Sequence, residues 1–196
     1  MSSWIILYLH ANPTWKAKAT AEVRSFIAKH GEEKPENLFE QLSKVPPEIW
    51  EDEMPILDVC LRETIRMTLS GASLRRVMPK ATTPIINGHQ LQPGSFVAYP
   101  IADAHLNPDI YSNPHTWDPE RYARGEDKKQ HWAYIGWGTG RHPCLGMRFA
   151  KLEVKIILAM FLTQFEYDVV DELGNAITRL PEPHRDNLYV WKFSLW

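Results

Sequence analysis

The feature that most constrains this chain is a glycine-rich loop that runs into an apolar helical pattern at residues 134–150. Three glycines alternate through its first half, at Gly136, Gly138 and Gly140. Glycine accepts backbone angles and close approaches that a Cβ forbids, so the spacing predicts a tight loop laid against something flat or bulky. The helical pattern starts directly after Cys144, which places this cysteine at or near a helix N-terminus. Exposed N–H groups and the helix dipole favour an anion there, so Cys144 is a candidate thiolate.

A thiolate in this position would act either as a nucleophile or as a soft metal ligand. Zinc needs three or four protein ligands, and no second cysteine lies near Cys144 in the sequence. A haem iron receives four nitrogens from the porphyrin and can take a single thiolate from the protein. Gly146, expected one turn into the helix, would let a porphyrin lie close to the backbone. The alternatives are a thiol nucleophile, for which no base partner is identifiable, and a buried structural cysteine beside a turn.

The residues around Cys144 form a pattern that resembles the cysteine loop of cytochromes P450. The family pattern is Phe-x-x-Gly-x-Arg-x-Cys-x-Gly, and this chain reads Trp137-x-x-Gly140-x-His142-x-Cys144-x-Gly146. An indole can also pack near the sulfur, and a histidine can still donate to a haem propionate. A histidine at this position is similar to the sterol 14-demethylase branch of the family.

The resemblance implies a haem site with defined residue roles. Cys144 would be the ligand of the iron, and His142 would hold a propionate. Trp137 would lie near the sulfur. The close approach of the porphyrin would depend on three glycines, which are Gly138, Gly140 and Gly146.

Composition indicates one ordinary globular core. The chain has 196 residues, 44% of them hydrophobic, and a net charge of −2, so nothing points to nucleic acid. The two cysteines, Cys60 and Cys144, give no disulfide framework, which favours a reducing compartment. The apolar runs at residues 4–9 and 156–162 are too short to span a bilayer, and the first lacks the flanks of a signal peptide.

Hydrophobic periodicity predicts a mainly α fold with a small β-sheet (α+β). Helices are expected at residues 4–9, 13–31, 38–42, 55–67 and 145–165. Strands are expected at residues 74–77, 95–99, 165–169 and 185–191, and a hairpin at residues 85–89. Residues 102–132 form a long connection, and charged or solvated turns are expected at residues 32–37 and 125–129.

A second charge-bearing motif lies in the helix expected at residues 55–67. Glu63 and Arg66 share one helix face, where such a pair is ordinarily a solvated bridge worth under about 1 kcal/mol. Their context resembles the Glu-x-x-Arg signature of the P450 K helix, and residues 119–122 resemble the family's Pro-Glu-Arg-Phe segment. The resemblance implies that Arg121 joins the pair in a structural network, in which a third charge locks loop to helix.

In the family, an arginine on the first strand of the small sheet contacts a haem propionate. Arg76 best matches that position, and Arg75 is the second choice. Spacing alone favours two solvated arginines on an edge strand. The seven histidines other than His142 show no ligand spacing and are interpreted as surface or structural residues.

Together the motifs identify the chain as similar to the C-terminal part of the cytochrome P450 fold. Residues 1–196 are expected to hold the end of the I helix, the J and K helices, the small sheet, the cysteine loop and the L helix. The N-terminal half is expected to be absent, and with it most of the substrate cavity and the acid–threonine pair of the I helix.

The resemblance implies a haem-thiolate monooxygenase that binds haem b and inserts one oxygen atom from O2 into an apolar small molecule, such as a sterol or another lipid. Electrons would come from NADPH through cytochrome P450 reductase. The rival hypothesis is a truncated, catalytically inactive fragment, or a haem-binding or interaction protein. An intact member is expected at the endoplasmic reticulum membrane; this sequence shows no anchor, so the expected location of the chain itself is cytoplasmic or left open.

Overall fold

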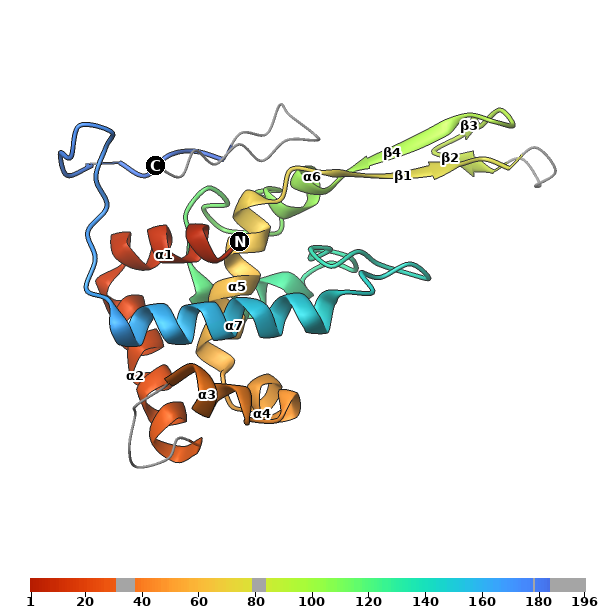
Figure 1. The fold of residues 1–196 in the computed structure, drawn as a ribbon. Coiled ribbons are helices and arrows are strands. Elements are labelled where there is room, and N and C mark those ends of the chain that lie inside the picture. The colour runs from red at the N-terminus through yellow and green to blue at the C-terminus, as the bar shows by residue number, and fades with distance from the viewer. Residues whose placement is uncertain (31–37, 79–83, 178, 184–196) are drawn as a thin grey trace.

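The computed structural model describes residues 1–30, 38–78, 84–177 and 179–183, and shows a helical body from which a β-ribbon projects (Figure 1). The α-helices are α1 (Ser2–Ala11), α2 (Pro13–His30), α3 (Leu38–Ser43), α4 (Pro47–Asp52), α5 (Pro55–Thr68), α6 (Ile101–His105) and α7 (Met147–Gln164). The 3-10 helices are η1 (Pro119–Tyr122) and η2 (Glu126–Lys128). The strands are β1 (Ala72–Arg76), β2 (Ile85–Ile86), β3 (His89–Gln90) and β4 (Phe96–Pro100). The mainly α fold with a small sheet is therefore confirmed.

Helix α5 lies at the centre of the helical body. Nine of its fourteen residues are buried, polar ones included, so other elements cover it on most sides. The helix starts without a side-chain cap of its own. Instead, Glu22 of α2 accepts hydrogen bonds from the backbone N–H groups of Ile56 (2.7 Å) and Leu57 (2.9 Å). A carboxylate from another helix thus satisfies the free donors and the positive end of the dipole at the start of α5.

Helix α4 begins at a pair of prolines, Pro46 and Pro47. Pro47 is the first residue of α4, and proline is well suited to that position because its missing N–H has no helical partner there. Lys155 of α7 is buried against this helix. Its Nζ donates to the carbonyl of Trp50 (2.6 Å) and lies 3.2 Å from a carboxylate oxygen of Asp58. This lysine ties α4, α5 and α7 together.

The two short sheets follow the predicted hairpin pattern. Strand β1 pairs antiparallel with β4, and β2 pairs with β3. The turn between β2 and β3 has positive φ at Asn87 (48°) and Gly88 (81°), as a type I′ turn requires. The predicted Asn-Gly hairpin is therefore confirmed.

The strand predicted at residues 165–169 is wrong. These residues pair with no strand in the described part of the chain, and only an isolated bridge joins Val170 to Ala176. The apolar alternation has another cause: Tyr167 packs on Phe161 and donates from its hydroxyl to the carbonyl of Ile6 (3.0 Å). The turn predicted at residues 32–37 and the strand at 185–191 lie outside the described residues. None of the described helices is both long and apolar enough to cross a bilayer.

Candidate functional site

The cysteine loop is closed by its own backbone. The N–H of Cys144 donates to the carbonyl of Trp137 (2.7 Å), and the N–H of Gly138 donates to that of Ile135 (2.9 Å). Gly138 has a φ of +77°, and a Cβ there would lie 3.1 Å from the carbonyl oxygen of His142. The backbone angle favours glycine at Gly138, and a Cβ there would also crowd this carbonyl.

Helix α7 begins at Met147, two residues later than predicted, so Cys144 lies three residues before its first turn. Gly146 is the N-cap of α7, so the expectation that it lies one turn inside the helix is wrong. A Cβ on Gly146 would meet no atom within 4 Å, and the same holds for Gly140. The described protein atoms therefore leave open space at both glycines.

The surroundings of Cys144 fit a large apolar group that brings its own metal ligands. The thiol is free and exposed, and the neighbouring Leu145 and Phe149 are 101% and 71% exposed. Among the described residues, no three His, Cys, Asp or Glu side chains gather so that they could hold a metal ion. A single thiolate beside exposed apolar side chains suits a haem iron, to which the porphyrin supplies four nitrogens. The residues present therefore fit haem.

A cavity of about 500 Å³ lies between the cysteine loop and the β1–β4 ribbon, which extends over the loop in Figure 1. Residues 138–142 line one side, and Arg75 and Val97, paired across the ribbon, line the other. Alternate residues of a strand point to opposite faces. Arg76 accordingly does not line this cavity, and its guanidinium lies 5.7 Å from the ring centre of Phe96. The structure thus brings Arg75 and His142 to one cavity, whereas Arg76, the first choice from the sequence, faces away.

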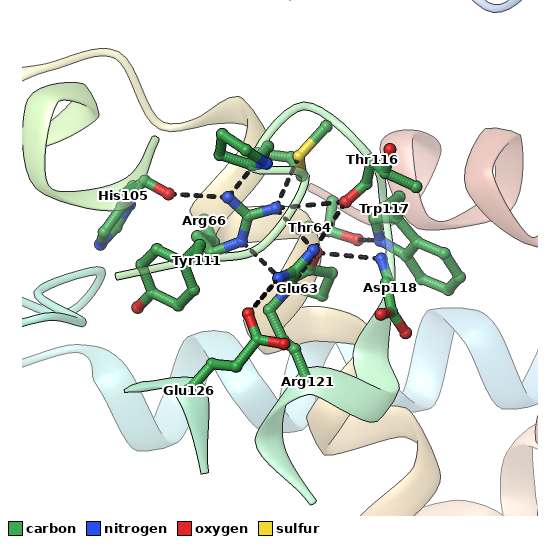
Figure 2. Close-up of polar contacts among 12 residues, drawn as sticks. Glu63, Thr64, Arg66, His105, Tyr111, Thr116, Trp117, Asp118, Arg121 and Glu126 are labelled. Atoms are coloured by element: carbon green, nitrogen blue, oxygen red, sulfur yellow. Dashed lines mark hydrogen bonds and ion pairs between the residues drawn. The ribbon is translucent and has the colours of Figure 1, made fainter. Parts of the chain in front are cut away.

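The structure also brings Glu63, Arg66 and Arg121 together (Figure 2). Arg66 donates from Nε and Nη2 to the two oxygens of Glu63, at 2.9 and 2.8 Å, and Arg121 donates from Nε at 2.9 Å. All three side chains are fully buried. Arg66 also donates to the backbone carbonyls of His105 (2.7 Å) and Pro114 (2.8 Å). The pair is therefore no solvated helix-face bridge: it holds the long connection 102–132 against α5.

A fourth charge, which no sequence motif indicated, completes this cluster. Glu126 is 4% exposed, and its Oε2 lies 2.7 Å from Nη1 of Arg121. Burial acts to raise the pKa of Glu126, but hydrogen bonds from Arg124 and Ser112 and the charge of Arg121 outweigh it and lower the pKa to about 2. Two arginines therefore face two glutamates, and the buried cluster is neutral.

The interpretation of residues 125–129 as a solvated turn is wrong at Glu126. Glu126–Lys128 form η2, which packs beside η1. The sequence held an electrostatic indication of Glu126. Glu63, Arg66 and Arg121 together carry one net positive charge, and burying that charge requires an acidic partner. The four residues Glu63, Arg66, Arg121 and Glu126 are called the charge cluster below.

Comparison with known proteins gives the family. The family model for cytochrome P450 matches residues 1–180. This chain belongs to the cytochrome P450 family. Cytochrome P450 monooxygenase AacuE of Aspergillus aculeatus is 36% identical over 181 residues, which cover 91% of this chain and 36% of that protein.

Other cytochromes P450 show the same partial overlap. Cytochrome P450 monooxygenase nsrP of Aspergillus novofumigatus is 36% identical over 163 residues, covering 82% of this chain and 32% of that protein. Sterol 14alpha-demethylase of Mycolicibacterium vanbaalenii is 29% identical over 170 residues, covering 86% of this chain and 34% of that protein. The chain thus spans about a third of the length of these relatives.

Proposed function

We propose that this chain is the haem-binding C-terminal part of a haem-thiolate monooxygenase, with Cys144 as the proximal ligand. One observation carries the proposal: a free, exposed thiol precedes a helix and is flanked by exposed apolar side chains, in a loop with the spacing of the family. The lack of any other metal-binding cluster among the described residues supports a metal whose remaining ligands come from a macrocycle.

The other residues of the site would hold the cofactor in place. His142 would donate to one propionate and an arginine of β1 to another. Strand alternation favours Arg75 for this role, and the family pattern favours Arg76. The open space at Gly140 and Gly146 would admit the porphyrin, with Gly138 forming the bend between them.

A bound haem would supply the oxygen chemistry, and a thiolate ligand favours cleavage of the O–O bond. The contribution of the chain is to hold the sulfur in place. The N–H of Cys144 is committed to the carbonyl of Trp137, so the backbone at the sulfur is fixed before any cofactor arrives. The indole of Trp137 packs against the hydrophobic core, and this contact anchors the cysteine loop.

The proposal also covers the activity of the whole protein. We propose that it accepts electrons from NADPH through cytochrome P450 reductase, and that an intact protein works at the endoplasmic reticulum membrane. The substrate would be an apolar small molecule. The similarity to a sterol 14alpha-demethylase supports a sterol or another lipid.

The test uses both cysteines. Residues 1–196 are supplied with haem, reduced and exposed to carbon monoxide, and the Soret band is recorded. Cys144→Ser should lose the red-shifted thiolate-type band, whereas Cys60→Ala should retain it because Cys60 is buried in α5. Equal spectra for the two variants would reject Cys144 as the ligand.

A second pair of variants decides between the two arginines. We expect Arg75→Gln to accelerate haem dissociation and Arg76→Gln to leave it near the wild-type rate. The opposite ranking would assign the propionate to Arg76.

A further inference from the structure

His105 connects the charge cluster to the cysteine loop. It is the last residue of α6 and is fully buried. Its carbonyl oxygen accepts a hydrogen bond from Nη1 of Arg66 at 2.7 Å. Its imidazole Nε2 lies 3.0 Å from the backbone N of Ile135, the second residue of the glycine-rich segment. One residue therefore touches both structures, through different atoms.

The hydrogen bond to Ile135 defines the protonation state of the ring. A backbone N–H can only donate, so Nε2 must carry a free lone pair and the proton must be on Nδ1. Burial, and then the charge of Arg66, lower the pKa of His105 to about 3, so the ring is neutral at physiological pH. The ring stacks on Tyr134, with centres 5.1 Å apart and planes 15° apart. Nδ1 has no hydrogen-bond partner among the described residues.

With Nδ1 unpartnered, the buried ring makes only one of the two hydrogen bonds open to it. Burying a polar atom without a partner costs free energy, and an apolar side chain would avoid that cost. The acceptor at Nε2 is the hydrogen-bonding function that an apolar replacement would lose. Ile135 is itself buried, so water is a poor substitute for this acceptor.

The hydrogen bonds continue from Ile135 to the cysteine. The carbonyl of Ile135 accepts from the N–H of Gly138 at 2.9 Å, and the carbonyl of Trp137 accepts from the N–H of Cys144 at 2.7 Å. Residues 140–146 of the cysteine loop are exposed, so little packing holds this part of the loop in place. The place of Cys144 therefore depends on how the start of the loop is held.

We propose that His105 is a positioning residue, whose neutral imidazole fixes the start of the cysteine loop against the charge cluster and thereby sets the position of Cys144. The role in ligand placement rests on the proposed function of Cys144. The bond from His105 to Ile135 is independent of it, and the experiment separates the two.

The experiment compares two unbranched replacements of similar length, His105→Gln and His105→Met. Glutamine offers an oxygen to the N–H of Ile135, and methionine offers only a weakly accepting sulfur. His115→Met is the matched control, because His115 is exposed on the same connection. Hydrogen exchange of the Ile135 amide is measured without haem. The fraction of carbon-monoxide complex with the thiolate-type band is measured after equal haem loading.

We expect the Ile135 amide to exchange about tenfold faster in His105→Met than in wild type, as for loss of one ordinary hydrogen bond. His105→Gln should restore most of the protection and most of the thiolate-type band, and His115→Met should match wild type in both. An unprotected Ile135 amide in the wild-type protein would overturn the inference without any variant. Equal exchange in the Gln and Met variants would also overturn it, because packing alone would then explain the effect.

Hydrogen exchange of the Ile135 amide still tests the inference if the chain takes up no haem. In that case the proposed function of Cys144 fails, while protection of Ile135 still tests the role of His105. If haem binds and His105→Met keeps the full thiolate-type band despite fast exchange at Ile135, the ligand-placing role is refuted.

Discussion

Removing the charge of Glu126 should destabilise the fold far more than removing that of a neighbouring glutamate. The pKa of this buried carboxyl falls from its usual 4.5 to about 2 in the folded protein. A depression of this size corresponds to about 3 kcal/mol of stability at neutral pH. Glu126→Gln keeps the shape but leaves Arg121 facing a neutral amide in a buried site. We therefore expect a loss of about 3 kcal/mol in the free energy of unfolding.

The pH dependence gives this prediction its sharpest form. A carboxyl with a depressed pKa contributes its stability fully above the unfolded pKa and loses it as the pH falls toward the folded pKa. The difference between wild type and Glu126→Gln should therefore shrink from about 3 kcal/mol at pH 7 to about 2 kcal/mol at pH 3.5. Urea unfolding followed by tryptophan fluorescence measures both values.

The matched control is Glu120→Gln, six residues away. The side chain of Glu120 is 53% exposed and pairs with Lys18 at 3.5 Å, so its removal should cost under about 1 kcal/mol. A Glu126→Gln difference that equals the control, or that does not change with pH, would refute the idea that Glu126 neutralises the cluster.

Other substitutions test contacts outside the cluster. Glu22→Ala leaves two N–H groups at the start of α5 unpaired and should cost about 1–3 kcal/mol by urea unfolding. Lys155→Met should cost a similar amount, about 1–3 kcal/mol, because it strands a buried carbonyl of α4; an unchanged melting temperature would contradict this. Gly136→Ala places a Cβ 2.5 Å from Cγ2 of Ile65 and should cost about 1–3 kcal/mol. Gly146→Ala meets no atom within 4 Å, so melting without haem should stay unchanged while haem affinity falls.

Local spacing predicted much of this molecule. The helix at residues 55–67, the Asn87-Gly88 hairpin and the glycine-rich loop each follow from residues that lie close together in the sequence. The caps and partners that come from elsewhere could not be predicted this way. Glu22 caps α5 by accepting from the N–H of Ile56, which lies 34 residues later, and no local pattern marks this contact.

The remaining differences have physical causes of the same kind. Whether Arg75 or Arg76 faces the cysteine loop depends on the pairing of β1 with β4, which places Val97 beside one and Phe96 beside the other. The alternation at residues 165–169 is real, but no strand lies alongside it in the described part of the chain. Periodicity shows which side chains are apolar, and the partner element decides what structure they adopt.

The burial of the charge cluster has a consequence for how the protein responds to its solution. Dissolved ions screen charges that they can approach, and none of the three signature side chains is accessible. Salt should therefore leave the attachment of the long connection intact, while acid loosens it. Between α6 and α7 this segment has little regular structure. Its shape depends largely on hydrogen bonds made by a few side chains. It should keep that shape in concentrated salt.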